Sequence, residues 1–169
     1  KKRKISNEDI EGIDVIVFDI QDVGVRFYTY LSTLHYAMEA SSRTNKKIII
    51  LDRPNPNSFY IDGPVLEIEN SSFIGLHPVP IVYGMTIGEY GRMINGEGWL
   101  ENKTKANLEV IRIKNYNHNM KYEPPVRPSP NLPNLQSIYL YPSLAFLEKT
   151  EVSVGRGTKI QFQIYGHPN

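Results

Sequence analysis

The sequence predicts an α/β protein with a mainly parallel sheet. Two nearly continuous apolar runs, at 13–18 and 47–51, each end in an aspartate. Such runs are typical of parallel strands that are covered on both faces, whereas half-buried strands alternate. Between them, the segment 29–43 places Leu31, Leu34 and Met38 at helical spacing. Strand, helix and strand in one short stretch therefore predict a right-handed βαβ unit.

The remaining elements follow from capping and turn residues. We expect the first helix to stop at Asn45, and the segment 52–80 to form a functional loop or a small hairpin. Thr86 and Glu89 have the spacing of a capping box, which predicts a helix over 86–95 that Gly96 and Gly98 end. Further strands are predicted at 108–113 and 160–165, and a short helix at 137–147.

Composition excludes several classes of function. The 169 residues carry a net charge of +1, so nothing indicates a nucleic-acid partner. There are no cysteines, which excludes disulfides and thiol catalysis. No apolar run approaches the roughly 20 residues of a membrane span. Because the chain starts without Met and soon enters a buried strand, we expect it to be an internal piece of a longer protein.

Polar side chains follow the first two predicted strands. Parallel strands place their carboxyl ends at one edge of the sheet, where ligands bind. Carboxylate, amide and guanidinium groups suit a polyhydroxylated ligand, and Tyr28 could offer a flat face to a sugar ring. The alternative is that the aspartates only cap helices or bind backbone amides. The candidates for substrate binding at this edge are Asp19, Gln21, Asp22, Arg26, Asp52, Arg53 and Asn55.

Other site chemistries have weaker support. Gln21 replaces the second acid of a phosphatase-type Asp-x-Asp, and no G-x-G-x-x-G follows the first strand. The histidines show no metal spacing, so we predict neither metal nor cofactor. Arg156, in the glycine-rich stretch 154–158, could reach an anion, although a plain turn is the alternative.

Carboxylates are therefore the remaining catalytic groups. Glu39 lies in the first predicted helix, where an exposed i, i+4 pair with Arg43 is the alternative to catalysis. Glu89 is accounted for by its capping box. Glu148 is predicted at the surface near a helix end.

Six segments in this order resemble the bacterial exo-β-N-acetylmuramidase (NamZ-like) family, in a form similar to its Bacteroidetes-type members. The resemblance covers essentially the whole chain, and six ordered motifs are far more specific than one. The segments are FDIQDVGVRFYTY at 18–30, LDRPNP at 51–56, DGPVL at 62–66, GMTIGE at 84–89, SPNLP at 129–133 and VSVGRGT at 152–158.

The resemblance implies a periplasmic or secreted glycosidase that removes N-acetylmuramic acid from the non-reducing ends of peptidoglycan fragments. It implies a Rossmann-like domain over 1–123 and, over 124–169, a Pro-rich segment that starts a smaller C-terminal subdomain. Of the family's two proposed glutamates, one corresponds to Glu39. Asn131 and Arg156, in the fifth and sixth segments, join the expected substrate-binding residues.

The sequence also departs from the family pattern. The Gly-Pro-Glu-His-Gly motif that carries the other glutamate is absent, and Leu147-Glu148-Lys149-Thr150 replaces the more usual Phe-Glu-Gly-Thr. We therefore expect weak or no activity for the piece alone, and exposed apolar surface where further strands should pack. A non-catalytic carbohydrate-binding module and a Rossmann-like nucleotide-binding domain remain the alternatives. The oligomeric state stays open.

Overall fold

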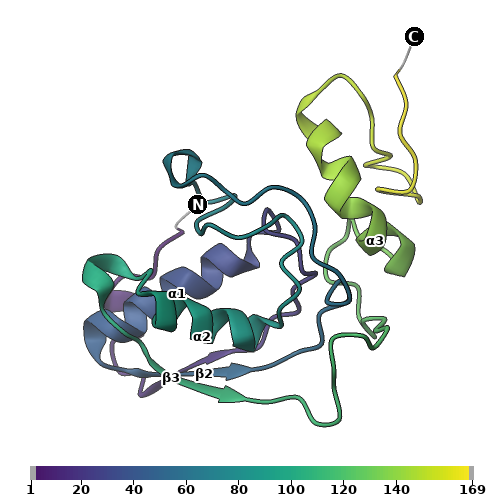
Figure 1. Ribbon diagram of the computed structural model, residues 1–169. Helices are drawn as coiled ribbons and strands as arrows, with labels where there is room; N and C mark the ends of the chain where they lie inside the picture. Colours follow the sequence, from purple (N-terminus) through teal and green to yellow (C-terminus); the bar gives the residue numbers. More distant parts are fainter. Residues whose placement is uncertain (1–2, 168–169) are drawn as a thin grey trace.

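A computed structural model describes residues 3–167, and it confirms the predicted α/β class with a parallel sheet (Figure 1). The sheet contains three strands within the described residues, β1 (Val15–Phe18), β2 (Lys47–Leu51) and β3 (Asn107–Ile111). They lie in the order β1-β2-β3, and both neighbouring pairs are parallel. The predicted βαβ unit is thus present.

Three α-helices accompany the described part of the sheet: α1 (Tyr30–Thr44), α2 (Ile87–Glu97) and α3 (Leu135–Leu144). α1 ends as predicted at Asn45, whose φ of 54° is left-handed. A 3₁₀ segment, Ala145–Lys149, follows α3 directly. No helix in this part of the chain is long and apolar enough to cross a bilayer.

The capping box of α2 is present as predicted. The Thr86 side chain accepts from the N–H of Glu89, and the Glu89 carboxylate accepts from the N–H of Thr86. The predicted stop at Gly96 is wrong, because Gly96 lies inside the helix. Gly98 is the C-cap, with a φ of 65° that favours glycine.

The main core lies between one face of the sheet and helices α1 and α2, which cover that face in Figure 1. Alternation along each strand sends Phe18, Ile48 and Ile50 into this core together with Leu34 and Tyr90. We expect Leu34 and Ile50 to carry much of its stability because both are fully buried.

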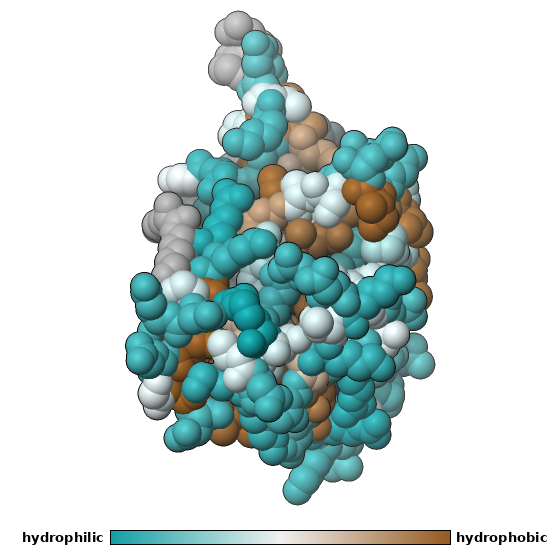
Figure 2. Space-filling model, turned by 90° about the vertical axis from the view of Figure 1, so that its left-hand side faces the viewer, coloured by the Kyte–Doolittle hydropathy of each residue, from teal (hydrophilic) through white to brown (hydrophobic). Residues whose placement is uncertain are grey.

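The opposite face of the sheet is exposed, so the expectation that the strands are covered on both faces is wrong for the described chain. The side chains of Val15, Val17, Leu51 and Ile111 are 36–57% exposed there. Apolar surface is thus exposed, but it lies on a face of the sheet, whereas the expectation concerned the place where further strands should pack. Figure 2 shows another side of the molecule, where hydrophilic side chains predominate and hydrophobic ones form separate patches.

A second, smaller core joins the segment after β1 to the C-terminal part of the chain. Val23 and Val25 pack there with Ile138 of α3 and with Phe162. The predicted strand at 160–165 is wrong, because the backbone reverses at Phe162, whose φ is 52° and whose N–H donates to the carbonyl of Val154. This reversal is what places the Phe162 ring in the core.

The segment 52–80 forms irregular loops, with a 3₁₀ turn at Ile68–Asn70 and isolated bridges such as Ser72 with Gly75. The division of the chain into domains at residue 123 stays a prediction.

Candidate functional site

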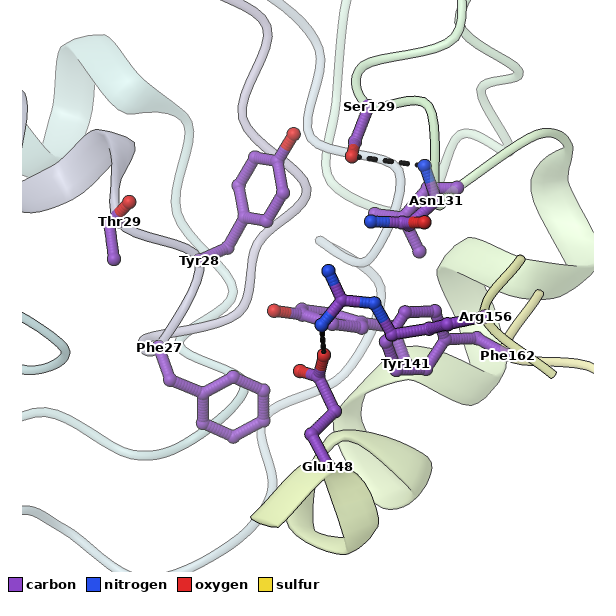
Figure 3. A pocket seen from close by; sticks show the side chains of 10 residues that line it. Phe27, Tyr28, Thr29, Ser129, Asn131, Tyr141, Glu148, Arg156 and Phe162 are labelled. Carbon is purple, nitrogen blue, oxygen red and sulfur yellow. Dashed lines mark hydrogen bonds and ion pairs between the residues drawn. The ribbon is translucent and has the colours of Figure 1, made fainter. Parts of the chain in front are cut away.

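A cavity of about 260 Å³ opens where the N-terminus of α1 faces α3 and the C-terminal turns (Figure 3). We call it the Arg156 pocket. It unites residues 27–29 with residues 129–162, which lie about a hundred positions later in the sequence. Its walls are Phe27, Tyr28, Thr29, Ser129, Asn131, Leu132, Tyr141, Glu148, Arg156 and Phe162.

An ion pair forms the polar centre of the Arg156 pocket. Nη1 of Arg156 donates to Oε1 of Glu148 at 2.5 Å, and the two side chains are 55% and 23% exposed. Figure 3 shows the guanidinium projecting between Tyr28 and Glu148. Opposite, the Ser129 hydroxyl accepts from the N–H of Asn131 at 3.2 Å, which fixes that loop. The pocket thus presents a carboxylate, a guanidinium and an amide around one cavity.

Tyr28 forms an aromatic wall with its hydroxyl held in place. This hydroxyl donates to the carbonyl oxygen of Pro128 at 2.8 Å. Burial, with the nearby Tyr30 and Asp22, raises the pKa of Tyr28 above its usual value, so the group stays a neutral donor. Thr29, the N-cap residue of α1, forms no side-chain cap in the described structure. The helix N-terminus therefore adds partial positive charge beside the pocket.

Three of the predicted edge residues line a neighbouring cavity of about 380 Å³, which we call the Arg53 pocket. Nε of Arg53 donates to Oδ1 of Asp19 at 2.6 Å. The Gln21 amide donates to the carbonyls of Asp22 and Pro54. Further walls come from the later chain, and the full set is Asp19, Ile20, Gln21, Tyr30, Arg53, Pro125, Val126, Arg127 and Pro128.

The side chains of Asp52 and Asn55 form hydrogen bonds that stabilise the fold. The Asp52 carboxylate accepts from the Thr86 hydroxyl and from the N–H of Gly88, both at 2.8 Å, and so binds the start of α2 to β2. This is the helix-capping role that the sequence left as the alternative. Asn55 is buried, donates to the carbonyl of Met85 and accepts from the N–H of Asn57. Neither residue lines the Arg156 or the Arg53 pocket.

Arg26 and Asp22 are likewise directed into the structure. Nη1 of Arg26 donates to the carbonyls of Pro64 and Val79, which fastens the long loop after β2. Asp22 is buried and accepts from the N–H of Gly24 and the hydroxyl of Tyr83. Its other oxygen, Oδ1, has no hydrogen-bond partner among the described residues. Burial raises the pKa of Asp22 to about 6, although the hydrogen bonds from Tyr83 and Gly24 oppose this.

The raised pKa predicts that Asp22 makes the fold less stable as pH rises. The unfolded carboxyl titrates near 3.8, so between that value and about 6 the folded state binds more protons. We expect Asp22→Asn to remove this decline, which amounts to about 2 kcal/mol from pH 4 to pH 7. Urea unfolding of both proteins at the two pH values measures it. His77, whose pKa burial lowers to about 3, acts in the opposite direction but equally in both proteins. Identical pH dependence in the two proteins would contradict the prediction.

Glu39 lies in a third cavity, beside Arg43 and Glu101. Its partners are His35 at 3.1 Å and, more weakly, Lys4 at 4.0 Å. Arg43 is not a partner, because its guanidinium bonds Asn7 and the carbonyl of Ile5. The contacts continue from His35 to His77 and from His77 to Tyr90, each at 3.0 Å.

When both imidazoles are neutral, the donor and the acceptor of each hydrogen bond in this chain of contacts are fixed. The Tyr90 hydroxyl donates to His77, His77 donates to His35, and His35 donates to Glu39. Burial lowers the pKa of both histidines, which supports the neutral forms. Glu39 is thus the acceptor at the outer end of a buried relay, and its cavity shares no wall residue with the other two pockets.

Glu148 is the site residue that the sequence placed at the surface without a role. Two signals were available: it lies between the fifth and sixth segments that resemble the family, and Leu147-Glu148-Lys149-Thr150 keeps the glutamate of the more usual Phe-Glu-Gly-Thr. The turn at Gly155, with a φ of 74°, returns the chain so that Arg156 meets Glu148 eight residues earlier.

A parallel α/β sheet beside a pocket of carboxylate, guanidinium, amide and tyrosine groups is typical of proteins that bind polar, hydroxylated ligands. Comparison with known proteins makes this specific. Residues 1–136 match the family model "Exo-beta-N-acetylmuramidase NamZ, N-terminal", and residues 139–169 match its C-terminal counterpart. The chain belongs to the exo-β-N-acetylmuramidase NamZ family.

Individual relatives agree with this assignment. The chain is 42% identical to the peptidoglycan β-N-acetylmuramidase NamZ of Bacillus subtilis strain 168, over 99% of this chain and 41% of that protein. Two crystal structures of DUF1343 family proteins from Bacteroides fragilis NCTC 9343 are similar. One has a TM-score of 0.95 at 50% identity, and the other 0.90 at 38%. They are matched over 98% of this chain and 47% and 44% of theirs, so the chain spans less than half the length of these relatives.

Proposed function

We propose that this chain supplies the muramyl-binding pocket of a peptidoglycan exo-β-N-acetylmuramidase, which releases N-acetylmuramic acid from non-reducing ends. The observation that carries the proposal is the Glu148–Arg156 pair, which stands in one cavity with Tyr28 and Asn131. Glycosidases of this kind need carboxylates at the scissile bond, and muramic acid differs from glucosamine by a lactyl carboxylate. The Arg156 pocket offers Glu148 as a carboxylate for the scissile bond and Arg156 as a cation for the lactyl carboxylate.

Arg156 is the proposed partner of the lactyl carboxylate. A guanidinium has five N–H donors, so it can bind a second carboxylate beside that of Glu148. The N-terminus of α1, which begins one residue after Thr29 in the pocket wall, attracts the same negative charge. Tyr28 and Tyr141 provide ring surface for the sugar, and Asn131 provides an amide for a hydroxyl.

Two glutamates of the chain are candidates for the catalytic carboxylate. Glu39 is the one that the family resemblance implies. Glu148 has stronger support from geometry, because it shares its cavity with Arg156 and Tyr28, whereas Glu39 is bonded to His35 in a separate cavity. We therefore propose Glu148 as a carboxylate that acts on the glycosidic bond.

Removing Arg156 tests the lactyl contact. In a full-length parent protein, Arg156→Ala is expected to raise the KM for a chromogenic muramide by about 10- to 150-fold, since hydrogen bonds to charged groups contribute about 1.5–3 kcal/mol. Binding of the corresponding glucosaminide, which has no lactyl group, should change much less. Arg92→Ala, at an exposed position of α2, is the matched control. Equal losses for both sugars would contradict the assignment.

We further propose that the parent protein acts in the periplasm or outside the cell, where peptidoglycan lies. Fractionation of cells that produce the tagged full-length protein tests this, and exclusive recovery in the cytosol would contradict it.

A further inference from the structure

We propose that the Arg53 pocket is a second saccharide subsite, which holds the N-acetylhexosamine on the leaving side of the scissile bond. This inference rests on the proposed function, since it takes the Arg156 pocket as the site of the muramyl ring. It gives Asp19, Gln21 and Arg53 a common role that is distinct from lactyl recognition.

The two pockets lie on either side of one wall. Tyr28 lines the Arg156 pocket and Tyr30 the Arg53 pocket, and their rings meet edge to face with centroids 4.9 Å apart. The second part of the wall is the segment 128–129, in which Pro128 lines the Arg53 pocket and Ser129 lines the Arg156 pocket. The hydrogen bond from the Tyr28 hydroxyl to the Pro128 carbonyl joins the two sides at 2.8 Å. Two sugars joined by one glycosidic bond need two such adjacent cavities.

The chemistry of the Arg53 pocket suits a neutral, hydroxylated ring. Asp19 and Arg53 are each about 40% exposed (42% and 38%), so both can bond a ligand while they remain paired. The Gln21 amide nitrogen is occupied by two carbonyls, which fixes the side chain and leaves Oε1 near the Tyr122 hydroxyl at 3.4 Å. Acceptors and donors in fixed positions are what hydroxyl and acetamido groups require.

A rival cavity of about 490 Å³ also has Glu148 and Arg156 in its walls. Besides residues shared with the Arg156 pocket, its walls are Ile74, Ala145, Phe146 and Lys149. Ile74 and Phe146 are more than half exposed there. This mainly apolar surface offers few directed bonds to hydroxyls, so the Arg53 pocket is the better match.

The test compares two substrates in the full-length parent protein. One is an aryl muramide, which has no leaving-side sugar, and the other is the disaccharide of N-acetylmuramic acid β-linked to N-acetylglucosamine. Val126→Trp fills the rim of the Arg53 pocket at a side chain that is 75% exposed, and Arg53→Ala removes donors. We expect each variant to lower the ratio of kcat/KM for the disaccharide to that for the aryl muramide at least tenfold. Arg92→Ala should leave this ratio unchanged.

Three results would overturn the subsite: an unchanged ratio in both variants, equal loss on both substrates, or a selective loss of disaccharide in Phe146→Ala instead. The last result would place the leaving sugar in the rival cavity. If the wild-type parent cleaves neither substrate, the proposed function fails and calorimetry decides the subsite. The subsite is then supported if the parent binds the disaccharide more tightly than methyl muramide and Val126→Trp loses this difference. Equal binding of the two sugars contradicts the subsite.

Discussion

Replacing Glu148 by glutamine in a full-length parent protein is expected to lower kcat on an aryl muramide by about 10²–10⁴-fold, the usual contribution of a general acid or base. The substitution keeps the size of the side chain but removes its charge and its capacity to transfer a proton. The fold should change little, because exposed ion pairs such as Glu148–Arg156 contribute at most about 1 kcal/mol. Steady-state kinetics together with thermal unfolding of the variant measure both effects.

Glu39→Gln is the matched comparison for this prediction. Glutamine can still accept the hydrogen bond from His35, so the buried relay is preserved. We expect kcat to stay within about tenfold of the wild type, which is below the range for loss of a general acid or base. If Glu39→Gln abolishes turnover while Glu148→Gln retains it, the family resemblance was the better guide and the geometric assignment is wrong.

Replacing Gly24 by alanine is expected to lower the free energy of unfolding by about 2–5 kcal/mol. Gly24 has a φ of 77°, where an alanine costs about 1–2 kcal/mol. An added Cβ would also lie 2.1 Å from Oδ1 of Asn55. That amide is buried and bonded to Met85 and Asn57, and the loss of one of these two bonds costs about 1–3 kcal/mol. Urea unfolding monitored by circular dichroism measures the loss.

Gly12→Ala separates the two causes. Gly12 has a similar φ of 72°, but no atom lies within 4 Å of its added Cβ. Its loss should therefore reflect backbone strain alone, about 1–2 kcal/mol. Equal losses at Gly12 and Gly24 would show that the contact with Asn55 does not matter.

The fold was predictable where local signals determine it. The runs that form β1 and β2, the periodicity of α1 and the capping box of α2 each depend on a few neighbouring residues. The C-terminal segment was not predictable in this way. Its apolar residues suggest a strand, but the backbone reverses at the positive φ of Phe162 and so places that ring in the second core.

The site was predictable only in part, because sequence indicates which residues follow a strand but not where their side chains point. Asp19 and Arg53 lie in a cavity, whereas Asp52, the residue directly after β2, turns instead to cap α2. Glu148 acquires its place from a turn at Gly155 that brings Arg156 to it. Such pairings depend on tertiary structure and carry no local pattern.

A crystal structure of the full-length Glu148→Gln protein with the uncleaved disaccharide tests the central claim most directly. The account predicts the muramyl ring in the Arg156 pocket, with the lactyl carboxylate within about 3 Å of the Arg156 guanidinium. A muramyl ring bound beside Glu39, or anywhere away from Arg156, would contradict it.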